Sequence, residues 1–235
     1  MASKECFHFT KLDRMFSIRD KGLQIRLENN SKAVGDSKRK ISFSETRIGA
    51  IGLYSNFYKV FYDYKNGLRQ PDPNKKGEVE MYKAIMKCNT MDDYLGQGPY
   101  LVFDGTGIEN EGGNTGHGGI YDGSTSKQSI DSKKLNVCLV RNNDTGHVSY
   151  DKNDYIHYLM SQLTEQDLGK MEPNIRKMFD FYYNQHQDKI ETFKTGNYSE
   201  KRVDIKTFCD VTQVKEDINN SIKQNFINGQ NEEER

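Results

Sequence analysis

The hydrophobic and polar positions of the N-terminal quarter follow two different periods. Apolar side chains dominate residues 5–10, which predicts a short strand, and residues 12–21 keep helical spacing up to Gly22, which ends the helix. Residues 40–44 alternate as a second strand, and the apolar positions of residues 45–64 recur at helical spacing. The pattern therefore predicts a strand, a helix, a strand and a helix in this order.

The middle of the chain predicts further strands between loops. Prolines mark residues 70–75 as a turn, and residues 79–91 are predicted to form a helix. Residues 100–103 and 135–140 are apolar runs of the kind that forms buried strands. Between them, residues 105–125 are rich in glycine, and a loop of this length in a compact domain is either functional or flexible.

The last third of the chain changes to helical spacing. Residues 153–163 and 174–193 are predicted helices, and residues 203–214 suit either a strand or a short helix. The polar tail from Lys223 is expected to fray at its end.

Together these elements predict an α+β fold in two parts. Strands and helices are mixed in residues 1–150, which we expect to form the core, and residues 151–235 form a helical C-terminal extension packed on it. A doubly wound parallel sheet would need a more regular alternation of strands and helices.

Charge and composition narrow the classes of protein. The chain has 34 Lys and Arg against 34 Asp and Glu, so its formal net charge of zero gives no electrostatic indication of nucleic-acid binding. Its 14 tyrosines and 12 phenylalanines predict an aromatic core. Four scattered cysteines favour reduced thiols, with two disulfides as the alternative.

No apolar stretch approaches the length of a membrane span, and no leader pattern opens the sequence. We therefore expect no membrane partner and a cytoplasmic protein, or one delivered into a host cell without a signal peptide. Many Lys, Asn, Ile and Tyr residues without Trp indicate an AT-rich coding genome, bacterial or viral.

His8 is the most informative polar residue because it stands inside an apolar strand. An imidazole can bind a ligand through one ring nitrogen while the protein holds the other. A histidine flanked by phenylalanines is also commonly a core or rim residue that only packs. The neighbouring motifs favour the first interpretation.

Three short motifs accompany this histidine: His8-Phe9-Thr10, then Gly22-Leu23, then Ile41-Ser42-Phe43-Ser44 ahead of a helix with small residues around Ala50 and Tyr54. The pattern resembles the ADP-ribosyltransferase superfamily. The resemblance implies a split β-sheet core and NAD as the substrate of an ADP-ribosyl transfer, which is a glycosyltransferase reaction. It also implies that His8, Phe9 and Thr10 contact the nicotinamide riboside and that Ser44 lies beneath the nicotinamide ring.

Three further residues are candidates for the same nucleotide site. Arg47 and Arg26 suit the pyrophosphate, because a guanidinium donates two parallel hydrogen bonds to phosphate oxygens. Tyr54 is the third candidate, and helical spacing also explains it as a core residue.

Departure of nicotinamide creates positive charge on the ribose, so a carboxylate is needed near the reacting carbon. In the family this glutamate precedes a late strand, and the matching residues 128–132 contain no Glu. Asp131 is the nearest acid, and Glu109 and Glu111 in the glycine-rich loop are the other candidates. Because the expected Glu is missing at this position, a second hypothesis stays open: the protein is a non-catalytic nucleotide- or partner-binding module.

Other chemistry has less support in the sequence. His117 in the glycine-rich loop is a further candidate for ligand contact. The histidines lack metal-ligand spacing, so no metal site is predicted, and His157 and His186 are expected to be exposed to solvent. A Gly-x-Ser-x-Gly hydrolase motif is absent, whereas a Cys-His protease stays open because its partners need not be close in sequence.

The leading hypothesis is therefore transfer of ADP-ribose to a macromolecular acceptor, protein or nucleic acid, by a bacterial or phage toxin or effector. RNA 2′-phosphotransfer uses a similar opening strand, but it needs several Arg and His side chains around two phosphates. The scattered arginines of this chain disfavour it.

Overall fold

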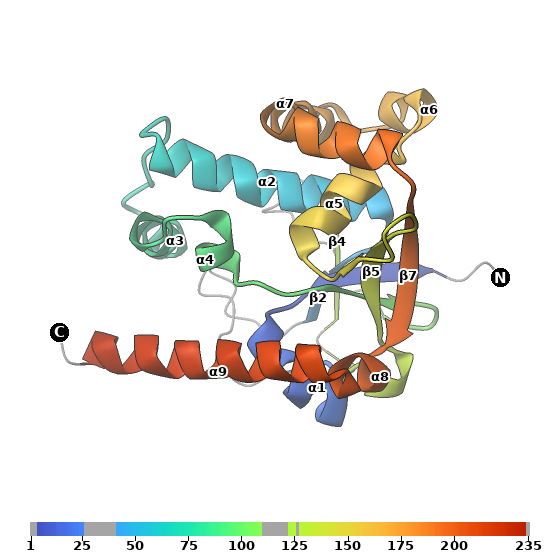
Figure 1. Ribbon diagram of the computed structural model, residues 1–235. Helices are drawn as coiled ribbons and strands as arrows, with labels where there is room; N and C mark the ends of the chain where they lie inside the picture. Colours follow the sequence, from blue (N-terminus) through green and yellow to red (C-terminus); the bar gives the residue numbers. More distant parts are fainter. Residues whose placement is uncertain (1–3, 26–40, 110–121, 126, 234–235) are drawn as a thin grey trace.

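The structure, a computed structural model, describes residues 4–25, 41–109, 122–125 and 127–233 (Figure 1). Its elements in chain order are β1 (Glu5–Phe9), η1 (Leu12–Arg14), α1 (Met15–Lys21), β2 (Ile41–Ser44), α2 (Arg47–Lys65), α3 (Lys76–Lys87), α4 (Met91–Leu95), β3 (Tyr100–Asp104), β4 (Asp122–Thr125), η3 (Ser132–Lys134), β5 (Asn136–Asn142), β6 (Val148–Ser149), α5 (Lys152–Ser161), α6 (Glu165–Gly169), α7 (Pro173–Thr195), β7 (Tyr198–Asp204), α8 (Ile205–Asp210) and α9 (Thr212–Glu233).

The described strands form one antiparallel sheet in the order β4-β2-β1-β3-β5, with β6 and β7 attached to β5. β7 pairs with β5 along its full length, and Asn136 and Val137 at the start of β5 also pair with β3. Val140 and Arg141 pair with β6 as well as with β7. It follows that β3 and β6 share one edge of β5 and that β7 occupies the other.

Helices cover both faces of this sheet and bury two separate apolar cores. In Figure 1, α2, α5 and α7 lie above the sheet, and α1, α8 and α9 lie below it. We call the two cores the upper core and the lower core. Phe7 of β1 belongs to the upper core, and its neighbour Cys6 belongs to the lower core, because successive strand side chains point to opposite faces.

Local sequence explains where several helices begin. The side chain of Thr46 accepts a hydrogen bond from the N–H of Gly49 and starts α2, and Asp151 caps α5 in the same manner. Thr90 and Thr164 form capping boxes with acids three residues later. Pro173 occupies the first turn of α7, where its missing N–H costs nothing.

The predicted α+β class is confirmed as a mixed fold with an antiparallel sheet. The C-terminal part from residue 151, predicted to be helical, contains helices α5 to α9 and also strand β7, which completes the sheet. Of the glycine-rich region, residues 110–121 lie outside the described part of the chain, and residues 122–125 form β4.

Gly22, predicted to end the first helix, does so with a backbone that other residues rarely adopt. It caps α1 at φ +73°, and a side chain there would collide with the carbonyl oxygen of Ile130. The pairing of Leu23 with Ile130 keeps this approach close.

We expect Gly22→Ala to lower the free energy of unfolding by about 3 kcal/mol or more, because strain and collision add. Gly67→Ala is the matched control, since Gly67 has φ +69° and no neighbouring atom lies within 4 Å of the point where its methyl group would stand, so only about 1 kcal/mol of strain is expected. Urea unfolding measures both variants. Equal losses would show that the Ile130 carbonyl yields to the methyl group.

Candidate functional site

The sheet separates between β1 and β2. These strands share only the pair Phe7 and Ser44, whereas β1 pairs with β3 at five positions and β2 pairs with β4 at four. Beyond Phe7 the two strands are therefore not joined by a regular ladder of main-chain hydrogen bonds. His8 is the first residue on the separated side.

The imidazole of His8 spans this separation. Its Nδ1 lies 2.8 Å from the carbonyl oxygen of Ser42 on β2. A carbonyl oxygen only accepts, so Nδ1 carries the proton and donates it. Within the described part of the chain, no group hydrogen-bonds to Nε2. The ring is thus fixed through one nitrogen and presents the other as an acceptor to a ligand.

Burial lowers the pKa of His8, and the hydrogen bond to Ser42 opposes this effect only in part. The imidazole is consequently neutral at neutral pH. A neutral ring is the form in which Nε2 accepts a hydrogen bond, for example from a sugar hydroxyl.

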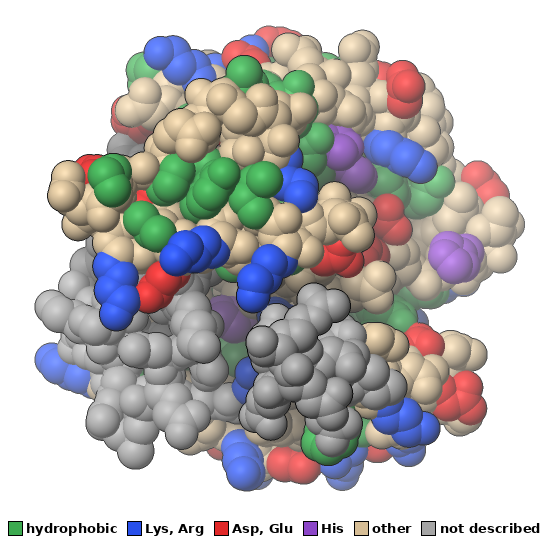
Figure 2. Space-filling model, turned by 90° about the vertical axis from the view of Figure 1, so that its left-hand side faces the viewer, with side chains coloured by type: hydrophobic (Ala, Val, Ile, Leu, Met, Phe, Trp, Pro, Cys, Tyr) green, Lys and Arg blue, Asp and Glu red, His purple; other side chains and the backbone are tan. Residues whose placement is uncertain are grey.

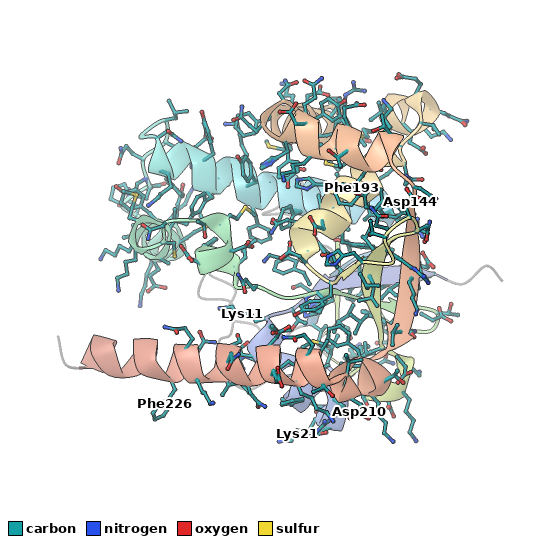
Figure 3. The ribbon with its side chains drawn as sticks, viewed as in Figure 1. Lys11, Lys21, Asp144, Phe193, Asp210 and Phe226 are labelled. Carbon is teal, nitrogen blue, oxygen red and sulfur yellow. The ribbon has the colours of Figure 1, made fainter. Side chains whose placement is uncertain are left out.

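Figure 2 shows Lys or Arg side chains and histidine side chains on the face of the molecule that carries α3. Lys11, two residues from the end of β1, lies between α4 and α9 (Figure 3). Its stem packs on Gly96, where a Cβ would come within 2.8 Å of it, and no carboxylate of the described residues pairs with its ammonium group. Lys11 is therefore available to an anion.

Of the other residues in the resembling motifs, Phe9 and Ser44 lie on the upper face of the sheet, and Thr10 follows the end of β1. Thr10 directly follows β1 and is buried, and its N–H donates to the carbonyl of Pro99 at 3.1 Å. Phe9 points to the upper core, where its ring meets those of Phe57 and Tyr100 edge to face at 5.9 Å. Ser44 is paired with Phe7 and is buried on the same face as Phe7, opposite His8.

Arg47 takes part in a network of charges at one end of the sheet. Its guanidinium lies 2.9 Å from Glu200 of β7 and 3.9 Å from Glu5 of β1. Arg202 bridges the same two carboxylates, and its hydrogen bond to Glu5 is the main cause that lowers the pKa of that glutamate. Arg47 thus joins α2 to β1 and β7, and a pyrophosphate would compete with two carboxylates for it.

Tyr54 lies deep in the upper core. Its hydroxyl donates to the amide oxygen of Asn153, and the Asn153 amide nitrogen lies 3.1 Å from both carboxylate oxygens of Asp92. The fully buried Lys152 completes this network, with its ammonium 2.7 Å from Asp92. Every polar group of the network has a partner, which is what makes its burial tolerable.

The acids predicted from the sequence lie in other contacts. Asp131 caps η3 by accepting from the N–H of Lys133 at 2.9 Å. Glu109 is exposed and pairs with Lys127 at 2.8 Å, which lowers its pKa. Glu111, like Arg26 and His117, lies outside the described residues. No hydrogen bond or ion pair joins Asp131 or Glu109 to His8.

One acid on the face of His8 was not predicted. Glu45 follows β2 directly, and continuing the register of Phe7 with Ser44 places it beside Cys6, on the lower face that carries His8. Its carboxylate is 20% exposed, lies 3.0 Å from the ammonium of Lys4 and borders Gly123 of β4. The sequence signal that could have identified Glu45 is the alternation of side chains along two paired strands, which places Glu45 and His8 on the same face.

Two histidines differ from expectation. His157 and His186, expected to be exposed, lie among aromatic side chains, and His157 is only 5% exposed. Tyrosine and phenylalanine rings surround both histidines. The residues next to each histidine in the sequence did not indicate this burial, because some of these rings come from other helices. The described residues contain no group of three or more His, Cys, Asp or Glu side chains placed to hold a metal ion.

Comparisons of the chain with protein-family models, with curated proteins and with solved structures found no match. Among the described residues, no helix combines the length and the apolar character that crossing a membrane requires.

The position of Tyr54 leads to a test of its role. We expect Tyr54→Phe to lower the free energy of unfolding by about 1–2 kcal/mol, because the Asn153 oxygen loses its donor. Binding of NAD should be unchanged, as measured by calorimetry on the folded variant.

Tyr62→Phe is the control, since the Tyr62 hydroxyl makes no hydrogen bond to the described residues and its loss should leave stability nearly unchanged. A specific loss of NAD affinity in Tyr54→Phe would instead assign this tyrosine to a ligand site.

Proposed function

We propose that the protein transfers ADP-ribose from NAD to a macromolecular acceptor, protein or nucleic acid, and that His8 binds the nucleotide. The observation that supports this most is the imidazole at the separation of β1 and β2. Its Nδ1 is fixed by the Ser42 carbonyl, and its Nε2, to which none of the described residues hydrogen-bonds, can accept a hydrogen bond from a ribose hydroxyl. An ADP-ribosyltransferase-like arrangement of the sheet is part of the proposal.

Lys11 is the better candidate for the pyrophosphate in this proposal. Arg47 is already paired with Glu200 and Glu5, whereas Lys11 has no carboxylate partner among the described residues and follows the strand that carries His8. An ammonium binds phosphate as a point charge, so it needs less exact geometry than a guanidinium does.

In the reaction, the bond between the ribose carbon C1′ and the nicotinamide nitrogen breaks and nicotinamide leaves with the bonding electrons. An acceptor oxygen or nitrogen forms the new bond to C1′ and loses its proton. Positive charge develops on the ribose as the first bond breaks, and a fixed carboxylate stabilises it. We assign this role to Glu45, because it shares the sheet face of His8, and Asp131, Glu109 and Glu111 remain the alternatives predicted from the sequence.

A second function is favoured by the contacts of the charged residues. Asp131 and Glu109 are engaged elsewhere, Arg47 is paired with two acids and Glu45 is paired with Lys4. A protein that binds a nucleotide or partner at His8 without turnover would have the same contacts. The two functions differ in whether nicotinamide is released.

We expect the purified protein to release nicotinamide from NAD and His8→Ala to abolish both release and NAD binding. His147→Ala is the matched control, since His147 is exposed on the turn between β5 and β6. Chromatography follows free nicotinamide, and calorimetry follows binding. NAD binding without release would support the binding module, and undiminished binding by folded His8→Ala would exclude His8 from the site.

For the acid, we expect Glu45→Gln to reduce the rate of nicotinamide release by about 10²–10³-fold with little change in NAD affinity. Glu80→Gln is the control, because it removes a charge of the same type from an exposed ion pair with Lys76. If Glu45→Gln releases nicotinamide at the wild-type rate, the acid lies elsewhere, and Asp131→Asn is then the next variant.

A further inference from the structure

The imidazoles of His157, which is buried, and of His186, which is half-buried, lie together between α5 and α7. Their ring centroids are 5.2 Å apart. The Nε2 of His157 lies 3.0 Å from the Tyr182 hydroxyl, and its Nδ1 is buried without a hydrogen-bond partner. The Nε2 of His186 is likewise buried without a partner. Each ring therefore keeps one polar nitrogen away from water and from other polar groups.

The pair coincides with a break in α7. His186 has φ −128° and ψ +21°, which is outside the helical region, although the helix continues to Thr195. Its ring stacks on Tyr182 at 4.3 Å and meets Tyr58 of α2 at 4.8 Å. The segment beyond the break, residues 187–195, is anchored by Ile190 in the upper core and leads into β7.

Among the residues that the structure describes, the groups that contact the two imidazoles include no acid that would stabilise a proton. From α7 these groups are Tyr182 and Lys189, and from α2 the group is Tyr58. No carboxylate of the described residues hydrogen-bonds to or pairs with either ring. Burial lowers the pKa of His157 to about 3, with His186 and Lys189 adding to the effect, and burial also lowers the pKa of His186.

A metal ion fits this place poorly. One nitrogen of His157 is already bonded to Tyr182, and a divalent cation would lie near the Lys189 ammonium without a carboxylate or thiolate to balance its charge. The two imidazoles are therefore better suited to take up protons than to bind a metal ion.

We propose that the His157–His186 pair is an acid-sensitive latch, which holds residues 187–195 against α5 while both rings are neutral and releases them when the rings take up protons. Two adjacent cations, one of them on the buried His157, would have to remain among aromatic side chains and near Lys189 if the segment stayed in place. Release lets both rings reach water.

The direction of the pH dependence follows from linkage. Both rings have a lower pKa when packed than when open, so the open form binds more protons at acidic pH. Above the ordinary histidine pKa of about 6.5 neither form is charged and the latch stays closed. Below it, the ratio of open to closed forms rises by up to about tenfold per imidazole for each pH unit, until the pKa of the packed ring is reached.

The test is hydrogen exchange of the full chain followed by mass spectrometry at about pH 7 and about pH 5, with rates corrected for the pH dependence of free amides. We expect the protection of residues 187–195 to fall at least tenfold on acidification while β3 keeps its protection. The double variant His157→Gln with His186→Gln should keep residues 187–195 protected at both pH values. His147→Gln, at an exposed turn, should behave as the unaltered protein.

Unchanged protection of residues 187–195 in the unaltered protein, or the same loss of protection in the double variant, would overturn the proposal. Should the double variant not fold, NMR titration of the imidazole signals in the unaltered protein takes its place. A His157 that titrates near pH 6.5 within the closed fold contradicts the latch, and one that stays neutral until the segment opens supports it.

Discussion

The alternation of side chains along β1 is the constraint on which the rest of the structure depends. This strand separates two apolar cores, with Phe7 in the upper core and Cys6 in the lower one. Its partner β3 follows the same division, so the central pair of strands joins both helical layers. His8 is on the lower face at the point where β2 leaves the ladder, and its ring replaces a main-chain hydrogen bond by donating to Ser42. The contact between His8 and Ser42 forms where the sheet separates beside this residue.

The sequence predicted the elements whose apolar residues repeat clearly. Strands β1, β2, β3 and β5 and helices α2, α5 and α7 agree with the predicted ranges within a few residues. The predicted segment 203–214 includes only the last two residues of β7 and continues as helix α8. The rest of β7 was missed because five of its seven residues, Ser199 to Arg202 and Asp204, are polar or charged and the strand lies at the edge of the sheet. Of the candidate site, His8 could be singled out from the sequence, since it is a lone polar group in an apolar run. Its partner could not, because a main-chain carbonyl leaves no trace in the sequence. Glu200 and Arg202 are distant in the chain from Arg47 and Glu5, so no local pattern connected them.

Two polar arrangements in the upper core contrast with each other. Around Lys152 every charge and amide has a partner, which joins α2, α4 and α5 in one geometry. Around His157 and His186 two nitrogens have no hydrogen-bond partner in the described part of the chain, and α7 departs from helical geometry at that point. A satisfied network stabilises a single arrangement, whereas an unsatisfied one makes the packed state sensitive to its surroundings. The upper core thus contains a rigid region around Lys152 and a second region, around His157 and His186, whose packing depends on whether the two imidazoles are charged.

The contacts of β1 also determine when the site can form during synthesis. The strand lies near the N-terminus, yet it pairs with β3, its Glu5 is bound by Arg202 of β7, and its lower face is covered by a core that includes Val214 and Ile218 of α9. Ribosomes release a chain from its N-terminus onward, and contacts between distant residues wait for the later partner. The nascent chain therefore carries His8 without its folded surroundings until α9 has begun to emerge. An activity located there would be withheld from the translating cell until synthesis reaches α9.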